Sequence, residues 1–280
     1  MPFKDLLVVV DHGRNCAARI DLGVQLARDF GAHLTGLYVG PAPYVQPAVF
    51  AEFPVEVIEM QASVAREAAD KAKALFTERT ERADFGLSSE WREGEGDVGE
   101  VASLHARYAD LAIIGQADPE DIPLGGASDL PERLILGAGR PALVVPYAGR
   151  FTTVGTRVLL AWNASREATR AASDALPLLQ RATQVTVLSV NPHGGSHGHG
   201  ALPGADIALH LARHGVRAAA SSVVTDEVGV DDMLLSQAAD ANADLIVMGA
   251  YGHSRLGELV LGGATRHLLR QITVPVFMSH

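Results

Sequence analysis

The 280-residue sequence predicts an α/β fold built twice in tandem, with a parallel sheet covered by helices on both faces in each copy. The first observation is a long internal repeat, which gives three pairs of similar segments: 5–27 with 157–179, 109–116 (ADLAIIGQ) with 243–250 (ADLIVMGA), and 140–146 (RPALVVP) with 273–279 (TVPVFMS). The second is an alternation of short, wholly apolar runs with amphipathic stretches. Such runs are typical of parallel strands that are buried on both faces.

The repeat divides the chain into two domains of similar length. Matching positions are 134 residues apart in the second pair, and in the third pair when Pro141 is set against Pro275, so the repeated unit is about half the chain rather than a short solenoid repeat. We predict a first domain over residues 1–147 and a second over 152–280, joined by the segment YAGRFTT.

The second copy shows the alternation of elements most clearly. Its predicted strands are 158–162, 185–190, 218–224, 245–248 and 274–278, and its predicted helices are 167–179, 205–214, 233–241 and 265–270. Sheets of this kind bind ligands beyond the carboxyl ends of their strands, where the strand order reverses. We therefore expect a ligand near the residues that follow 245–248.

Composition and charge exclude several classes of protein. With 48% hydrophobic and 20% charged residues the chain is ordinary globular protein, and no apolar run approaches the ~18 residues of a membrane helix. The first residues do not resemble a signal peptide, and a single cysteine excludes an internal disulfide, so we expect a cytoplasmic protein. The net charge of −10 lies entirely in residues 1–147, which argues against nucleic acid as a partner and makes the second domain the better host for an anion.

A glycine-rich loop follows the strand 245–248. Glycines after a strand allow positive φ and let an oxygen approach the backbone, and a helix N-terminus presents free N–H groups to an anion. Gly249 and Gly252 meet the first condition, and the pair Gly262–Gly263 directly precedes the predicted helix. Arg255 and Arg266 are candidates for charge-assisted hydrogen bonds to phosphate. The alternative is that these glycines only permit tight turns and helix packing.

This loop resembles that of the universal stress protein family in its tandem form. Nucleotide-binding members carry Gly, two residues, Gly, nine residues, Gly and then Ser or Thr, and Gly249, Gly252 and Gly262 fit that spacing. Here Gly263 replaces the hydroxyl residue, with Thr265 as a candidate substitute, and Asn163 stands where the family has an aspartate at the end of its first strand. The resemblance covers essentially the whole chain. It implies doubly wound five-stranded domains that pair with each other, and binding of ATP or ADP, with Mg²⁺ as a candidate companion ion.

The candidate nucleotide-binding residues are accordingly Asn163, Gly249, Gly252, His253, Arg255, Gly262, Gly263 and Thr265. We predict no catalytic residue and no resident metal site, and hence stress-response binding and signalling rather than catalysis, with slow ATP hydrolysis left open. The other interpretation is a nucleotide-free protein-interaction module of the same fold. No membrane partner is expected, whereas an unidentified protein partner and a homodimer stay open. The resemblance also implies pairing through the last strands, 142–145 and 276–278.

The first copy carries acidic residues where the second has glycines. At the offset of 134, Gly252 corresponds to Asp118 and Gly263 to Asp129, and carboxylates would repel phosphates. Asp11 keeps the strand-end aspartate of the family. We therefore predict a degenerate first domain that binds no nucleotide.

Four other features are expected to be structural. The segment GEGDVG (94–99) is predicted to be a turn with Asp97 as a helix N-cap, and Asp231 and Asp232 are predicted to open a helix. Cys16 is predicted to be a buried, inert thiol. The histidines of segment 191–204 are predicted to lie in a loop without a metal.

Overall fold

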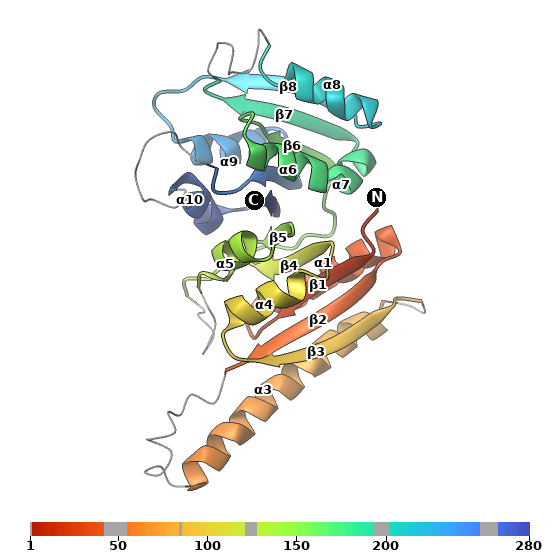
Figure 1. The fold of residues 1–280 in the computed structure, drawn as a ribbon, viewed down its shortest axis with the longest axis vertical. Helices are drawn as coiled ribbons and strands as arrows, with labels where there is room; N and C mark the ends of the chain where they lie inside the picture. The colour runs from red at the N-terminus through yellow and green to blue at the C-terminus, as the bar shows by residue number, and fades with distance from the viewer. Residues whose placement is uncertain (1, 42–54, 84–85, 121–127, 193–201, 253–262) are drawn as a thin grey trace. The chain divides into compact units, whose positions relative to one another are not determined.

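The structure is a computed structural model that describes residues 2–41, 55–83, 86–120, 128–192, 202–252 and 263–280. The chain forms two compact units. One, the N-terminal unit, is Phe3–Ala138, and the other, the C-terminal unit, consists mainly of Gly139–His280. Figure 1 shows helices on the faces of the strands in each unit, as the apolar runs predict.

The N-terminal unit contains four parallel strands in the order β3-β2-β1-β4. They are β1 (Asp5–Val10), β2 (His33–Gly40), β3 (Ser89–Glu95) and β4 (Leu111–Gly115). The helices are α1 (Cys16–Phe30), α3 (Val55–Glu81), α4 (Val98–Ala106) and α5 (Leu130–Gly137). The strand order reverses between β1 and β4, so the ends of these two strands form the ligand-binding position of such a sheet.

The core of this unit includes the neighbouring strands β1 and β4. Leu6 pairs with Leu111 and Val8 with Ile113, and all four side chains are buried. β3, by contrast, is an edge strand whose side chains are mostly half-buried or exposed. Helix α3 has only two buried residues, and Figure 1 shows its first half extending beyond the strands.

The C-terminal unit contains six strands in the order β5-β10-β9-β6-β7-β8. They are β5 (Ala142–Val145), β6 (Arg157–Ala161), β7 (Gln184–Val190), β8 (Ala218–Val223), β9 (Leu245–Gly249) and β10 (Val276–Ser279). The helices are α6 (Arg166–Asp174), α7 (Leu176–Arg181), α8 (Ala205–Arg213), α9 (Val230–Asp240) and α10 (Gly263–Gln271). The reversal falls between β6 and β9.

β5 comes from the first repeat but belongs to the C-terminal unit. It pairs antiparallel with β10, with Leu143 opposite Phe277 and Ala142 opposite Met278, whereas the other pairings described in this unit are parallel. Both strands are buried along their whole length. This confirms the pairing of the two repeats through their last strands.

One predicted helix is wrong in its continuity. The segment 167–179, expected to be a single helix, forms α6 and α7, which meet at Ala175. Pro177 lies in the first turn of α7, where its missing N–H costs nothing, whereas inside a continuous helix it would clash with the preceding turn.

Among the described residues, no helix has both the length and the apolar character needed to cross a membrane.

Candidate functional site

The candidate site of the C-terminal unit lies where β6 and β9 end. β6 is followed by the turn 162–165, which leads into α6, and β9 is followed by residues 250–252. Because the strand order reverses between these two strands, their ends are where a ligand is expected. Three segments surround this position: the turn after β6, the loop after β9 and the start of α10.

The turn after β6 is closed by two local side-chain hydrogen bonds. The Oδ1 atom of Asn163 accepts from the backbone N–H of Ser165 at 3.1 Å, and Ala164 between them has a positive φ of 57°. Ser165 caps α6, because its Oγ accepts from the N–H of Ala168 at 3.1 Å. Asn163 is exposed, so one end of its amide shapes the turn while the other faces outward.

Gly249 is the point where α6 meets the sheet. A Cβ atom there would overlap the backbone of Glu167 and Ala168 and would lie 2.8 Å from the Cβ of Glu167. No side chain fits, so this glycine permits the close approach of the first turn of α6 to the end of β9. Its role in the described structure is packing, independent of any ligand.

Gly252 faces the same turn at a looser distance. Its Cβ position is 3.0 Å from Glu167 Oε2 and 3.7 Å from Ser165 Oγ, and no backbone atom is among its nearest neighbours. The two glycines of the predicted motif therefore differ, since the first supports helix packing and the second leaves room beside polar groups.

Glu167 brings a carboxylate to this position. Glu167 is buried, and burial alone would raise the pKa of its carboxyl group. Hydrogen bonds from its own backbone N–H and from the Ser165 hydroxyl, together with the nearby charges of Arg166 and His280, hold the pKa below its usual value. The group is thus ionised at neutral pH. Sequence reasoning missed it, because a glutamate in the first turn of a helix is ordinary.

The loop after β9 is held in place by backbone contacts. Ala250 donates to the carbonyl of Ser279 at 2.8 Å and accepts from Nδ1 of His280 at 3.0 Å. Tyr251 is buried with a positive φ of 56°, and its N–H lies 3.4 Å from Thr265 Oγ1. The Thr265 hydroxyl, predicted to replace a phosphate-binding serine, therefore accepts from the loop backbone and is itself buried.

Helix α10 begins at Gly263, directly after residues 253–262. Three of the predicted site residues, His253, Arg255 and Gly262, lie outside the described residues. Arg266, the second arginine predicted to bind phosphate, is exposed on α10. His267 contacts Asp231 at the start of α9 through Nδ1, and its Nε2 lies 3.1 Å from Gln271 Nε2.

Asp231, Asp232 and His267 also form the single group of potential metal ligands found among the described residues, with ligand atoms within 4.8 Å of one another. Both aspartates lie in the first turn of α9, as predicted. The imidazole, however, already uses both ring nitrogens within the protein. We therefore interpret the cluster as a link between α9 and α10.

The equivalent position in the N-terminal unit is filled by an ion pair between a buried arginine and an aspartate whose side chain is 33% exposed. Arg19 reaches from α1 to the end of β1, where its Nη2 lies 2.6 Å from Asp11 Oδ2 and its Nε donates to the carbonyl of Val9 at 3.0 Å. A Cβ on Gly115, the counterpart of Gly249, would overlap the Arg19 guanidinium. Burial alone would raise the pKa of Asp11, but Arg19 and the N–H of Gly13 hold it below its usual value. The nearby Cys16 thiol is buried, and burial raises its pKa, as expected for an unreactive cysteine.

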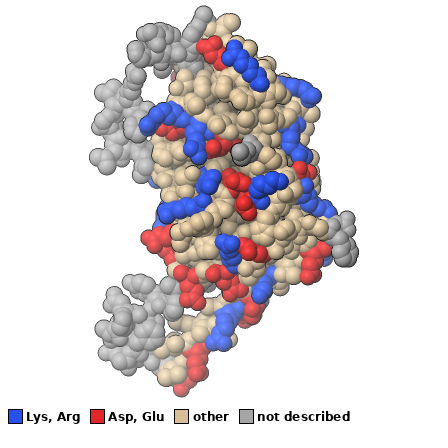
Figure 2. All heavy atoms as spheres, turned by 45° about the vertical axis from the view of Figure 1, so that its right-hand side comes forward, with Lys and Arg blue, Asp and Glu red and all other residues tan. Residues whose placement is uncertain are grey.

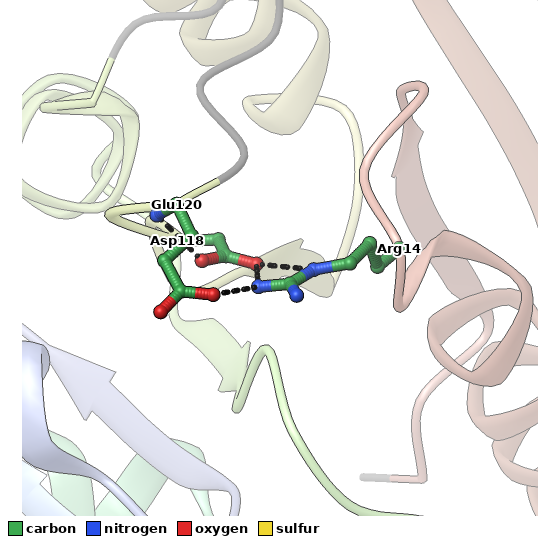
Figure 3. Close-up of polar contacts among 3 residues, drawn as sticks. All are labelled: Arg14, Asp118 and Glu120. Atoms are coloured by element: carbon green, nitrogen blue, oxygen red, sulfur yellow. Dashed lines mark hydrogen bonds and ion pairs between the residues drawn. The ribbon is translucent and has the colours of Figure 1, made fainter.

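A second ion pair closes the outer part of this position. Arg14, in the turn after β1, binds Asp118, in the loop after β4, through Nη2 at 2.5 Å and Nε at 2.9 Å (Figure 3). Glu120 lies 3.5 Å from the same guanidinium, and its N–H donates to Asp118 at 2.9 Å. The acidic residue predicted to disable this domain is thus engaged by a basic one.

One more sequence expectation is settled in this unit, whereas one in the C-terminal unit stays a prediction. Asp97 caps α4 by accepting from the N–H of Glu100 at 2.8 Å, and it also pairs with Arg133, which confirms the turn predicted for GEGDVG. The histidines 193, 197 and 199 lie outside the described residues.

Comparison with known proteins agrees with this architecture. The model of the universal stress protein family matches residues 2–138 and 156–280, which is most of the chain. None of the curated proteins matches the sequence.

Among solved structures, a universal stress protein from Archaeoglobus fulgidus DSM 4304 is similar over 98% of this chain and 96% of its own, with 17% identity and a TM-score of 0.72. A putative universal stress protein from Pseudomonas aeruginosa UCBPP-PA14 is similar over 99% of this chain and 93% of its own, with 16% identity and a TM-score of 0.55. A functionally unknown protein from Pseudomonas aeruginosa PAO1 covers 99% and 92%, with 14% identity and a TM-score of 0.55. At these identities the likeness establishes the shared fold.

Proposed function

The chain belongs to the universal stress protein family, and we propose that its C-terminal unit binds ATP or ADP beyond the ends of β6 and β9. The observation that carries the proposal is Gly252. It stands where the N-terminal unit has Asp118, and around its Cβ position the nearest atoms are the tips of polar side chains. A phosphate oxygen can approach such a backbone, and the N-terminus of α10 follows after ten intervening residues.

The exposed amide of Asn163 adds a group suited to a base. It lies at the end of β6, and its Oδ1 is occupied by the turn. We propose that the Nδ2 group donates to the nucleotide, and that His253, Arg255, Gly262 and Gly263 contribute from the segment that leads into α10. Thr265 then acts indirectly, by holding Tyr251.

The ionised Glu167 determines how phosphates can be accommodated. A carboxylate beside Gly252 repels a bare phosphate, whereas Mg²⁺ is commonly bound by one or two carboxylates together with phosphate oxygens. The donor set fits Mg²⁺, since Glu167 offers a hard oxygen ligand at the loop. We propose that the ligand is the magnesium complex of the nucleotide, with Glu167 as the protein group nearest the ion.

The proposed role is binding and signalling rather than turnover. Among the described residues at this site we identify no nucleophile paired with a general base. Figure 2 shows acidic and basic side chains interspersed over the face that it draws, which fits a small anionic ligand better than a nucleic acid backbone. As expected from the sequence, we also propose a cytoplasmic location, with Cys16 as a free thiol.

A protein-interaction module is the second candidate function, and one observation favours it. Helix α3 exposes large apolar side chains at Val55, Met60 and Val64, and Met60 is 62% exposed. Apolar groups along one protruding helix are typical of protein contacts. The two functions are compatible, because these residues lie in the N-terminal unit.

The test begins with the protein as purified. It is denatured, and the supernatant is analysed by chromatography for ATP and ADP; in parallel, the shift of Tm by Mg-ATP is measured. We expect the native chain to bind nucleotide, Gly252→Asp to lose it and Gly252→Ala to keep most of it, because alanine adds no charge. Absence of both bound nucleotide and a Tm shift in the native chain would contradict the proposal and favour the interaction module.

A further inference from the structure

The N-terminal unit shows what an arginine in the turn after the first strand does. Arg14 precedes α1, and it crosses to the loop after β4 to hold Asp118 by two hydrogen bonds (Figure 3). The Arg14 side chain is 55% exposed and that of Asp118 is 8% exposed, so the anion is the enclosed partner. This unit therefore contains a bound carboxylate at the mouth of its own strand-end position.

The repeat supplies the same arginine in the C-terminal unit. In the alignment of residues 5–27 with 157–179, Arg14 corresponds to Arg166, and in the alignment of 109–116 with 243–250, extended two positions, Asp118 corresponds to Gly252. The flanking strands correspond as well, since β1 pairs with β4 as β6 pairs with β9. The C-terminal unit therefore keeps the arginine, as Arg166, but has Gly252 in place of the aspartate.

Arg166 lies between two residues whose side chains contact the position that Asp118 would occupy. Its neighbours in sequence on either side, Ser165 and Glu167, are the residues whose side chains lie nearest the Cβ position of Gly252. Its own side chain is 87% exposed, and its nearest acidic contact among the described residues is Glu167 Oε1, 3.7 Å from Nη2. This ion pair is longer than the 2.5 Å pair of Arg14 and Asp118, so Glu167 does not hold Arg166 as closely as Asp118 holds Arg14.

We propose that Arg166 binds the phosphates of the nucleotide, in the way that Arg14 binds the carboxylate of Asp118. The inference rests on the proposed function and adds the residue that distinguishes a nucleoside diphosphate or triphosphate from a nucleoside. A guanidinium offers paired N–H donors that match phosphate oxygens, and such charge-assisted bonds are among the strongest in proteins. The N-terminal unit then carries an internal substitute for the ligand of the C-terminal unit.

The experiment compares Arg166→Ala and Arg166→Lys with Arg170→Ala. Arg170 is the matched control, because it lies one turn further along α6 and pairs with Asp174 at 2.7 Å. Dissociation constants for Mg-ATP, Mg-ADP and adenosine are measured by calorimetry on the full chain at two salt concentrations. Circular dichroism verifies that each variant is folded.

We expect Arg166→Ala to weaken Mg-ATP binding about ten- to a hundredfold and to leave adenosine binding unchanged. Arg166→Lys should recover part of the loss, and Arg170→Ala should bind like the native chain. Equal losses for ATP and adenosine, or no loss for ATP, would overturn the role of Arg166 while leaving the proposed function intact. If the native chain binds none of the three ligands, the proposed function and this inference fall together.

Discussion

The two units have similar sequences at their strand ends, but different groups occupy the space beside the glycine that ends β4 or β9. In the N-terminal unit, the Arg19 guanidinium lies against Gly115, and no backbone atom of α1 is among the nearest neighbours of that glycine's Cβ position. In the C-terminal unit, the position of Arg19 is taken by Ala171, and the backbone of α6 packs directly on Gly249. The glycine that both repeats share thus permits a different packing arrangement in each unit.

The two units also differ in the charged residues that lie further out from these glycines. Arg14 binds Asp118 at 2.5 Å in one unit, whereas in the other the position of Asp118 is Gly252 and Arg166 lies 3.7 Å from Glu167. The N-terminal unit satisfies its own cations with its own anions. The comparison teaches that the end of a strand can be closed from within, because protein side chains of opposite charge neutralise one another there.

The largest predicted effect comes from breaking the buried ion pair. Asp11→Asn leaves the Arg19 guanidinium buried without its counter-charge, and we expect a loss of about 3–5 kcal/mol in the free energy of unfolding. Urea denaturation followed by circular dichroism measures it. The matched change in the other unit, Asn163→Ala, removes an exposed turn residue and should cost less than about 1 kcal/mol.

A double variant sharpens this prediction. Asp11→Asn combined with Arg19→Met removes both charges, and an apolar replacement of a buried pair is often close to neutral. We expect the double variant to be more stable than Asp11→Asn alone. If the single variant matches the native stability, Asp11 is not the group that compensates the buried guanidinium.

The next effect concerns the two glycines of the C-terminal unit. Gly249→Ala forces α6 away from β9, and overpacking of this kind costs about 1–3 kcal/mol. Gly252→Ala adds a Cβ beside the flexible ends of Glu167 and Ser165, so its cost should be smaller. Thermal denaturation of both variants without nucleotide tests the order; equal losses would mean that Gly249 has no special role in helix packing.

A smaller effect is expected from opening the N-terminal unit. Asp118→Gly copies the residue at position 252 and releases Arg14, and we expect a cost of about 0.2–1 kcal/mol because that guanidinium is half exposed. In a Gly252→Asp background the variant should still bind no nucleotide, since the Arg19 guanidinium continues to occupy the space beside Gly115. Binding of Mg-ATP, measured by calorimetry, would show that Asp118 alone separates the two units.

The fold could be predicted from the sequence because its signals are local or repeated. The apolar runs of β4 and β9 and the turn chemistry at Asp97 leave marks within a few residues or at a fixed offset, whereas the pairing of the last strands was implied by the family resemblance. The break between α6 and α7 also had a local mark, Pro177, which the amphipathic pattern around it obscured.

The chemistry of the site was less visible, because it depends on contacts between distant segments. The Arg19–Asp11 pair and the carboxylate of Glu167 beside Gly252 arise only when a helix start meets a strand end. One usable signal existed. The repeat aligns Arg14 with Arg166 and Asp118 with Gly252, and comparing both pairs together would have shown that the arginine is kept while the carboxylate at position 118 becomes glycine.

The smallest predicted effect is the pH dependence contributed by Glu167, and it tests the open character of the C-terminal site. Its pKa in the folded protein is lowered from the ordinary 4.5, so the stabilisation that it provides is present above that pH and is lost as the pH falls below it. Stability curves of the native chain and Glu167→Gln, measured by urea denaturation, should therefore converge in acid. The same variant should make ATP binding less dependent on Mg²⁺, because the carboxylate that repels the bare phosphate is gone. If Glu167→Gln keeps the full magnesium dependence, the ion is held by other groups, and the contrast between the two units rests on Gly252 and Arg166 alone.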